Sequence, residues 1–260
     1  MLLRTSPPYP GLKARVLAAL LHVGGSAIVA GLTALLVFKV WYPWPFDLLA
    51  GGVGLFKLIV GVDVALGPLL TFAVFDVRKP RRVLARDLAV LVCCQLVAVA
   101  YGVHTMFIAR PVAMALEGPR LRVVSAADVA VDELPQALPA FRSLSVTGPV
   151  QVGTADPQGD DKLDAISKAL AGQDVGARPK FWRPWDDAAR RQARQAAQAV
   201  PAFIGRKPTT AAALRRALAE QGLNEAAVGV LPIVSRFGQS VALINLSTGE
   251  IAGYAPIDGF

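Results

Sequence analysis

Apolar residues in the first 110 positions form long continuous runs rather than short periodic patches. The runs are long enough to span a bilayer, which takes about 20 residues, and they cover approximately 16–40, 48–75 and 87–109. The first run is too long for the roughly 7–15-residue apolar core of a signal peptide, and no Ala-x-Ala site follows it, so we expect it to be retained. The pattern predicts a three-helix transmembrane bundle in residues 1–110.

Beyond residue 110 the apolar positions alternate, or recur at helical spacing, over much shorter stretches. Strands are predicted at 112–118, 120–126, 149–155 and 227–236, and within 239–257 on both sides of a hairpin turn at "STGE" (247–250). Helices are predicted at 159–172, 185–200 and 209–223, the last with a Thr cap. We expect Gly153–Asp161 and Gly172–Lys180 to be surface loops. Residues 111–260 are therefore predicted to form a small α+β domain, with α/β as the alternative.

Basic residues are concentrated beside the apolar runs. Residues 1–109 contain 10 Lys and Arg against 4 Asp and Glu, whereas residues 110–260 contain 17 against 15. This excess favours the anionic surface of a lipid bilayer over nucleic acid as the partner.

Orientation follows from the short connecting segments, because positively charged loops remain on the cytoplasmic side. The charges are Arg4, Lys13, Arg15, Arg78, Lys79, Arg81, Arg82 and Arg86. We therefore expect a cytoplasmic N-terminus, with residues 111–260 on the outer side. The aromatic residues Trp41, Tyr42, Trp44 and Phe46 are expected at the outer membrane interface.

An acid lies at the centre of the second run. Asp63 is about 18 Å from the cytoplasmic end of that run at 1.5 Å per residue. A charged carboxylate facing lipid there costs several kcal/mol, so we expect Asp63 to face the other helices, to be protonated, or both. At helical spacing it shares a stripe with Gly67 and Thr71 that suits close helix contact, and Pro68 predicts a kink.

The third run offers partners for this acid. Gln95, Ala98, Tyr101, Gly102 and Thr105 fall broadly on one side of it, and Tyr101 has a depth close to that of Asp63. We predict a contact from Asp63 to Tyr101 or to Gln95. This intramembrane polar seam comprises Asp63, Gly67, Pro68, Thr71, Gln95 and Tyr101. The first interpretation is that the seam only holds the helices together, and the second is that it recognises another membrane helix or moves a proton.

The residue types exclude several kinds of chemistry. All histidines and cysteines, namely His22, His104, Cys93 and Cys94, fall in the apolar runs. Residues 111–260 therefore contain no Ser-His or Cys-His nucleophile pair and no His or Cys metal ligand. We expect no catalytic residue, no cofactor and no bound metal. His22 is interpreted as a packed or interfacial histidine, and the cysteines as buried apolar residues.

The segment "RPKFWRPW" (178–185) is the most distinctive part of the second region. Phe181, Trp182, Arg183 and Trp185 are candidates for docking a partner protein or a glycan. The alternative is a Pro-braced loop whose aromatic side chains cover the domain core, and the pattern slightly favours this alternative.

The stretches "VDVALGPLLTFAVFD", "WYPWPFD" and "CQLVAVAYGVHTMFIARPV" resemble the TfpX/TfpZ family of type IV pilin accessory proteins. The resemblance covers most of residues 10–115 and, more loosely, the tail through "FW" and "STGEI". It implies a role in type IV pilus assembly in the inner membrane of Gram-negative bacteria, without established catalytic residues. The residues that match the family's pattern are Asp63, Gly67, Pro68, Tyr101, Arg110 and Pro111.

Together these observations predict a non-catalytic inner-membrane accessory protein with a periplasmic domain. It would contact type IV pilin, and other pilus assembly proteins as further candidates, and assist pilus assembly or pilin stability. The alternative is a small membrane transporter or proton-linked sensor that uses Asp63. A periplasmic enzyme is disfavoured by the absence of His and Cys from residues 111–260.

Overall fold

The computed structural model describes residues 11–260, and these form two compact units. The helical unit comprises residues 11–37 and Val53–Met106, and the α/β unit comprises Phe38–Gly52 and Phe107–Phe260. Arg4, one of the charges used to predict the orientation, lies outside the described residues.

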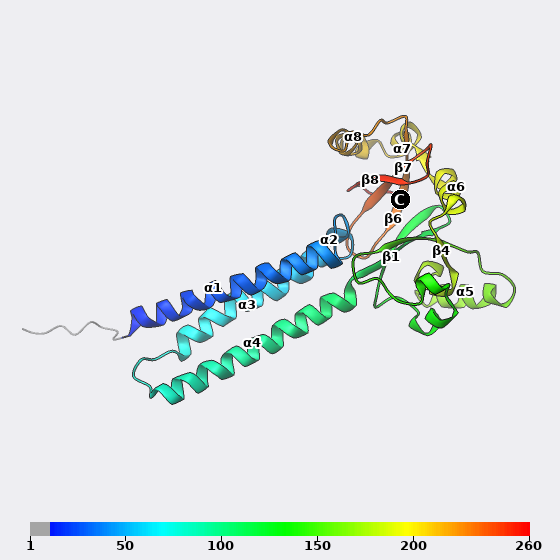
Figure 1. Cartoon of the computed structure of the whole chain (residues 1–260). Coiled ribbons are helices and arrows are strands. Elements are labelled where there is room, and N and C mark those ends of the chain that lie inside the picture. Colours follow the sequence, from blue (N-terminus) through cyan, green and yellow to red (C-terminus); the bar gives the residue numbers. More distant parts are fainter. Residues whose placement is uncertain (1–10) are drawn as a thin grey trace, which may run out of the picture. The chain divides into compact units, whose positions relative to one another are not determined.

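Three long helices make up the helical unit (Figure 1). They are α1 (Leu12–Leu36), α3 (Gly52–Val74) and α4 (Arg81–Ala109). Each is long and apolar enough to cross a membrane, and only 6–11% of the residues in their most apolar windows are buried. Most side chains of these helices are therefore at least partly exposed, as expected for apolar helices that lipid rather than water surrounds.

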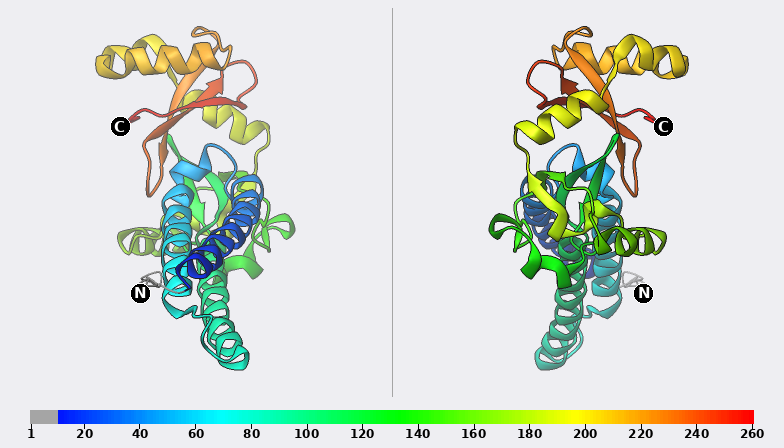
Figure 2. Two further views of the ribbon diagram at one scale, coloured as in Figure 1. Left: turned by 90° about the vertical axis from the view of Figure 1, so that its left-hand side faces the viewer. Right: turned by 90° about the vertical axis from the view of Figure 1, so that its right-hand side faces the viewer.

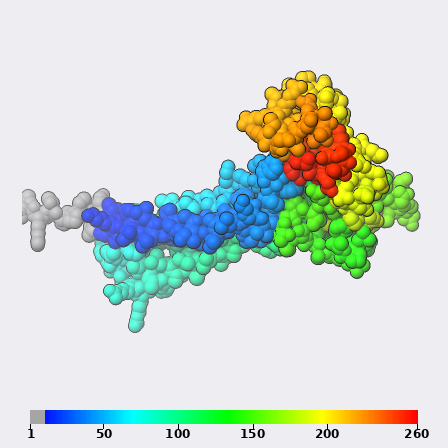
Figure 3. Space-filling model, turned by 45° about the horizontal axis from the view of Figure 1, so that its top comes forward, coloured from blue at the N-terminus to red at the C-terminus, as the bar shows by residue number. Residues whose placement is uncertain are grey.

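The three helices pack side by side as a bundle, which Figure 2 shows from two directions. In the space-filling view, the surface of α1 (blue) runs between those of α3 and α4 (Figure 3). The loop after α3 is held by charge, because Arg15 of α1 and Arg78 both donate to Asp76, at 3.0 and 2.8 Å. Hydrogen bonds from Arg78, and a weaker one from Arg15, hold the pKa of Asp76 well below its usual range.

A mixed eight-stranded sheet organises the α/β unit. Its strands are β1 (Pro111–Glu117), β2 (Arg120–Ser125), β3 (Val150–Thr154), β4 (Trp182–Pro184), β5 (Gln198–Ala199), β6 (Val228–Val234), β7 (Ser240–Asn245) and β8 (Ile251–Ala255). The order is β4-β3-β1-β2-β6-β7-β8, with β5 beside β6. The β1–β3 and β2–β6 pairs are parallel and the others are antiparallel. The predicted strands are confirmed.

Helices cover both faces of this sheet, because its central strands are apolar on both sides. The helices are α2 (Phe46–Leu49), α5 (Asp160–Leu170), α6 (Asp187–Ala196), α7 (Val200–Arg206) and α8 (Ala211–Glu220). Val228 and Val230 of β6 pack against α7 and α8. Leu231 and Ile233 of the same strand pack on the other face, with α2 and α6.

Several helical and loop predictions are corrected by the structure. The helix predicted at 185–200 ends at Ala196 and gives way to β5 and α7. Thr210 precedes α8 without a side-chain cap, although Gly222 ends that region with the expected positive φ of 64°. Residues 172–180 are not a surface loop, because 3-10 turns at Val175–Ala177 and Pro179–Phe181 bury most of the segment's second half.

The segment between α1 and α3 belongs to the core of the α/β unit. Tyr42 is fully buried, and Phe46 and Leu49 pack against strand residues such as Met114. Tyr42 and Phe46 therefore do not present their rings to lipid headgroups as expected, since their side chains are covered by protein. Trp44 is exposed.

Candidate functional site

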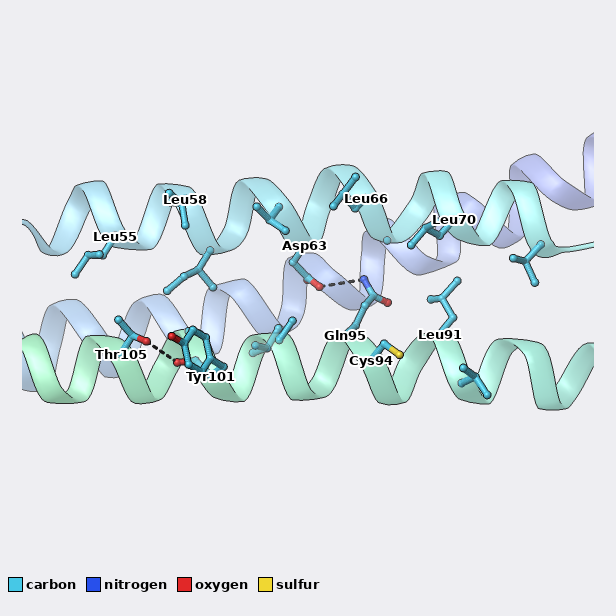
Figure 4. A pocket seen from close by; sticks show the side chains of 18 of the residues that line it. Leu55, Leu58, Asp63, Leu66, Leu70, Leu91, Cys94, Gln95, Tyr101 and Thr105 are labelled. Atoms are coloured by element: carbon cyan, nitrogen blue, oxygen red, sulfur yellow. Dashed lines mark hydrogen bonds between the residues drawn. The ribbon is translucent and has the colours of Figure 1, made fainter.

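Two polar side chains meet at the centre of the helical unit. Asp63 is the middle residue of α3 and Gln95 is the middle residue of α4. Gln95 Nε2 donates to Asp63 Oδ1 at 3.0 Å, and the two side chains point toward each other across the space between the helices (Figure 4). The predicted contact between Asp63 and Gln95 is confirmed. Tyr101, the other predicted partner, lies six residues further along α4, about 9 Å at helical rise.

Gly67, one turn after Asp63, leaves room beside α3 for the side-chain ends of Gln95 and His22. A Cβ atom at this position would lie 2.1 Å from Gln95 Nε2 and 2.7 Å from His22 Nε2. Any larger residue would therefore push apart the side chains that α1 and α4 contribute. Small residues serve this purpose in membrane helix packing, where apolar burial does not drive association.

His22 of α1 joins the polar seam next to Gly67. Its Nδ1 atom lies 2.6 Å from Thr71 Oγ1, and Thr71 is only 4% exposed. This agrees with the interpretation of His22 as a packed histidine, but its partner Thr71 was not foreseen. The sequence shows the depth of each residue along its own helix, whereas this pairing depends on how α1 and α3 are aligned.

Pro68, another predicted seam residue, lies inside α3, which continues past it to Val74. The two cysteines of the third apolar run, Cys93 and Cys94, were expected to be buried, but both are exposed on the protein surface.

A groove of about 540 Å³ lies between α3 and α4. Its walls are mainly Leu, Ile and Val side chains, and the groove also contains the polar residues Asp63, Gln95, Tyr101 and Thr105. All five residues that were predicted to share one side of the third apolar run line this groove. Tyr101 is 73% exposed, and its backbone oxygen accepts a hydrogen bond from Thr105 Oγ1 (Figure 4).

A second hollow of about 240 Å³ lies between α1 and α4. It is lined by His22 and Ser26 of α1, and it shares Asp63 and Gln95 with the first groove. The Asp63–Gln95 hydrogen bond thus forms part of the partition between the two hollows. A carboxyl group can accept hydrogen bonds and, when protonated, donate one.

Within residues 11–260 no group of three or more His, Cys, Asp or Glu side chains is placed to hold a metal ion. The polar seam instead combines one carboxyl, one amide, one imidazole and one hydroxyl from three helices. Such an arrangement suits helix recognition or proton binding.

The aromatic segment 178–185 lies mostly inside the α/β unit. Phe181 and Trp182 are buried, and Trp182 Nε1 donates to the Gly176 carbonyl at 2.7 Å. This placement fits the interpretation that the aromatics cover the domain core. It leaves Arg183 and Trp185 as the partly exposed members of the set proposed for docking.

A buried ion pair explains why this segment is folded inward. Arg178 is fully buried, and its guanidinium donates to both oxygens of Glu133, at 2.7–3.1 Å. Burial alone would raise the pKa of Glu133, but hydrogen bonds from Arg178 and Lys168 reverse the effect and hold the pKa below its ordinary value. Arg178 also donates to Asp164. This pairing of charges is therefore interpreted as structural.

Comparison with known proteins gives consistent results along the chain. The family model "Fimbrial assembly protein FimB" matches residues 10–51. A fimbrial assembly protein of serogroup I from Dichelobacter nodosus is 32% identical over 92% of this chain and 94% of its own length. The serogroup E1 protein of the same organism is 31% identical over the same shares.

A third relative, the fimbrial assembly protein of serogroups C1 and C2 from the same organism, is 42% identical over 45% of this chain and 89% of its own length. No solved structure matches the chain. Since the first two relatives align over nearly the whole of both chains, this chain belongs to the family of fimbrial assembly proteins.

Proposed function

We propose that this chain is a non-catalytic accessory protein of type IV pilus assembly, of the TfpX/TfpZ kind that its sequence resembles. Its three apolar helices would cross the inner membrane of a Gram-negative bacterium, with the α/β unit in the periplasm. The observation that carries the proposal is the similarity to a fimbrial assembly protein over 92% of the chain. The basic loop between α3 and α4 supports a cytoplasmic position for that loop.

We further propose that the protein contacts pilin directly and so assists its assembly or stability. The groove between α3 and α4 would hold the apolar N-terminal helix of pilin, and the α/β unit would contact its globular part. Apolar walls and the small residues Gly67 and Gly102 suit a second helix better than a polar ligand. The Asp63–Gln95 pair would supply the polar group that fixes the depth of the bound helix.

Photo-crosslinking from two matched positions tests this proposal in cells. Leu58 lines the groove and is 67% exposed, whereas Leu32 of α1 is 64% exposed and is not among the residues that line the groove. Both lie within two helical turns of the predicted outer ends of their helices. A photoreactive residue at 58 should capture pilin, and one at 32 should capture much less. Equal capture, or none from 58, would contradict the proposed groove.

A second candidate function is a small transporter or a proton-linked sensor. It is favoured by one observation, namely that Asp63 and Gln95 line both hollows of the helical unit. Asp63→Asn keeps the size of the side chain but removes the titrating group. Loss of pilus assembly with normal protein level and normal pilin capture would favour the proton-linked function. Loss of the protein itself would indicate that Asp63 acts in folding.

A further inference from the structure

The turn between β6 and β7 carries an aromatic side chain at its tip. Phe237 is 65% exposed. The turn is braced on both sides of it, because Ser235 Oγ donates to the Gly238 carbonyl at 2.5 Å and accepts from the Gly238 amide at 3.3 Å. The structure therefore holds a large apolar ring outward in an ordered turn.

The Phe237 ring lies against Gly51. Gly51 has a φ of 73°, and a Cβ atom there would meet the ring at 2.6 Å. Both observations require glycine at this position. Because Gly51 immediately precedes α3, the ring lies at the point where the chain enters its second long apolar helix.

Two further exposed apolar side chains accompany Phe237. Trp44 is 60% exposed and Leu48 is 53% exposed. All three line one hollow of about 330 Å³ in the α/β unit, together with Tyr254 and Pro256. Trp44 is held by an edge-on contact with the ring of Tyr254, at 5.7 Å between centroids. We call the rings of Trp44 and Phe237, with the adjoining Leu48 side chain, the aromatic patch.

The chain connections place this patch at the membrane-facing side of the α/β unit. The α/β unit continues into the helices at three points, next to Phe38, Gly52 and Phe107. These points are tied to one another, because Trp41 stacks edge-on against Phe107 at 5.2 Å and Tyr42 lies against Gly52. If the helices span a membrane, the face that carries these three points must lie next to its surface. Phe237 touches the neighbouring Gly51.

We infer that the aromatic patch is a membrane anchor that inserts into the boundary between lipid headgroups and acyl chains. Trp and other amphipathic or apolar side chains are favoured at this depth, about 5–10 Å into the boundary. Arg236 is 68% exposed beside Phe237 and is available to lipid phosphate, with Asp128 at 3.7 Å as its nearest acid. The inference rests on the membrane-spanning part of the proposed function and is independent of pilin binding.

Depth-dependent fluorescence quenching tests the anchor in the full chain. Cys93 and Cys94 are first replaced by Ser, and an NBD label is attached to a new cysteine from Phe237→Cys or, separately, Leu48→Cys. The control is Thr248→Cys, in the exposed turn at the opposite end of β7, about 20 Å away at strand rise. The protein is reconstituted in vesicles of phosphatidylethanolamine and phosphatidylglycerol that contain lipids with doxyl groups near the headgroup end.

We expect the labels at 237 and 48 to emit at shorter wavelength and to lose about half or more of their emission to doxyl lipid. The label at 248 should remain close to unquenched. Water-like emission at both 237 and 48, equal to that at 248, overturns the inference. Shielding of 237 that appears only when purified pilin is added also overturns it and indicates a protein-docking patch.

A label from Leu58→Cys separates this inference from the proposed function. Quenching at 58 by doxyl groups deep in the acyl chain, without quenching at 237 or 48, would overturn the anchor while leaving the membrane-spanning helices intact. Absence of quenching at 58 would overturn both.

Discussion

The helical unit exposes many apolar side chains on its surface, whereas the α/β unit encloses them in its interior. Leu58 of α3 is 67% exposed, whereas Leu231 of β6 is fully buried. In the α/β unit the sheet excludes water from an apolar interior. In the helical unit the outside is apolar, so burial of leucine gains little and the contacts between helices depend on small and polar residues.

The interior polar groups of the two units differ in the same way. The α/β unit encloses a full ion pair, Arg178 with Glu133, and surrounds it with further charges. The helical unit joins one acid to a neutral amide and one imidazole to a hydroxyl. Polar groups therefore hold both interiors. Among the described residues the α/β unit buries its Arg178–Glu133 pair, whereas the ion pairs of Asp76 and Asp87 in the helical unit lie at and beside the loop between α3 and α4.

Removing one member of the buried ion pair should have the largest effect. Glu133→Ala leaves the Arg178 guanidinium buried without its principal partner, and we expect a loss of about 3–5 kcal/mol in the stability of the α/β unit. All four tryptophans, Trp41, Trp44, Trp182 and Trp185, belong to this unit, so tryptophan fluorescence of the full chain during unfolding reports it selectively.

The control for this prediction is an exposed pair in the same unit. Asp187 is 84% exposed and pairs with Arg190 at 3.1 Å. Asp187→Ala should leave the unfolding transition almost unchanged, because exposed pairs contribute little. Equal effects from the two substitutions would show that the Arg178–Glu133 pair is not a special part of the core.

Acid should weaken the α/β unit through the same residue. The pKa of Glu133 is lower in the folded unit than its ordinary value of 4.5. Its contribution is therefore complete above about pH 4.5 and is lost as the pH falls through the lower, folded value. The tryptophan-detected melting temperature should fall over this window, and it should fall less steeply in Glu133→Ala. Parallel pH profiles would assign the acid sensitivity to other carboxylates.

A side chain added at Gly67 should lower the stability of the helical unit. Gly67→Ala places a methyl group against the side-chain ends of Gln95 and His22, so both must move and their hydrogen bonds to Asp63 and Thr71 are disturbed. Because these ends can shift, we expect a cost near the lower end, about 1 kcal/mol, of the range for overpacking. Gly61→Ala in the same helix is the matched control, because a Cβ atom there meets nothing within 4 Å. Loss of helical circular dichroism during titration with SDS should come earlier for Gly67→Ala alone. A shift of the same size for both would attribute the effect to the loss of glycine rather than to crowding.

The Asp63–Gln95 hydrogen bond should give the smallest effect. Polar contacts between membrane helices contribute on average about 0.6 kcal/mol, and at most about 1.7. A double-mutant cycle with Asp63→Ala and Gln95→Ala should return a coupling energy in this range by SDS titration. The same cycle between Asp63 and the more distant Thr105 should be additive, and coupling there would reveal a wider network.

Those features that depend on local pattern were predictable from the sequence. Three apolar helices follow from run length, and the strands follow from short alternating or β-branched segments. The contact of Asp63 with Gln95 was one of two predicted alternatives, because polar residues within apolar runs avoid lipid by facing one another. Tyr101 was the other alternative because its estimated depth was close to that of Asp63. Counting residues along each helix does not fix how α3 and α4 are aligned, and the alignment brings Gln95 to Asp63 instead.

The features that sequence patterns missed depend on long-range packing. Residues 172–180 have the Gly-rich, polar composition of a surface loop, but the salt bridge of Arg178 with Glu133 compensates for their burial. Residues 38–52 are short and rich in Pro and Trp, without a helical or strand period that would indicate a buried face. The pairing of His22 with Thr71 depends on the alignment of two helices, which neither helix encodes alone.

The α/β unit is built from two separate stretches of the chain, Phe38–Gly52 and Phe107–Phe260, and this limits the order in which its core can form. Phe46 and Leu49 are synthesised before the second and third long helices, yet their partners include Met114 of β1 and Ile244 of β7. This part of the core must wait for nearly two hundred further residues before it can close. Contacts so distant along the chain form late. A ribosome-stalled or truncated chain that ends before β7 would therefore expose this early segment, and a quality-control protease should remove it.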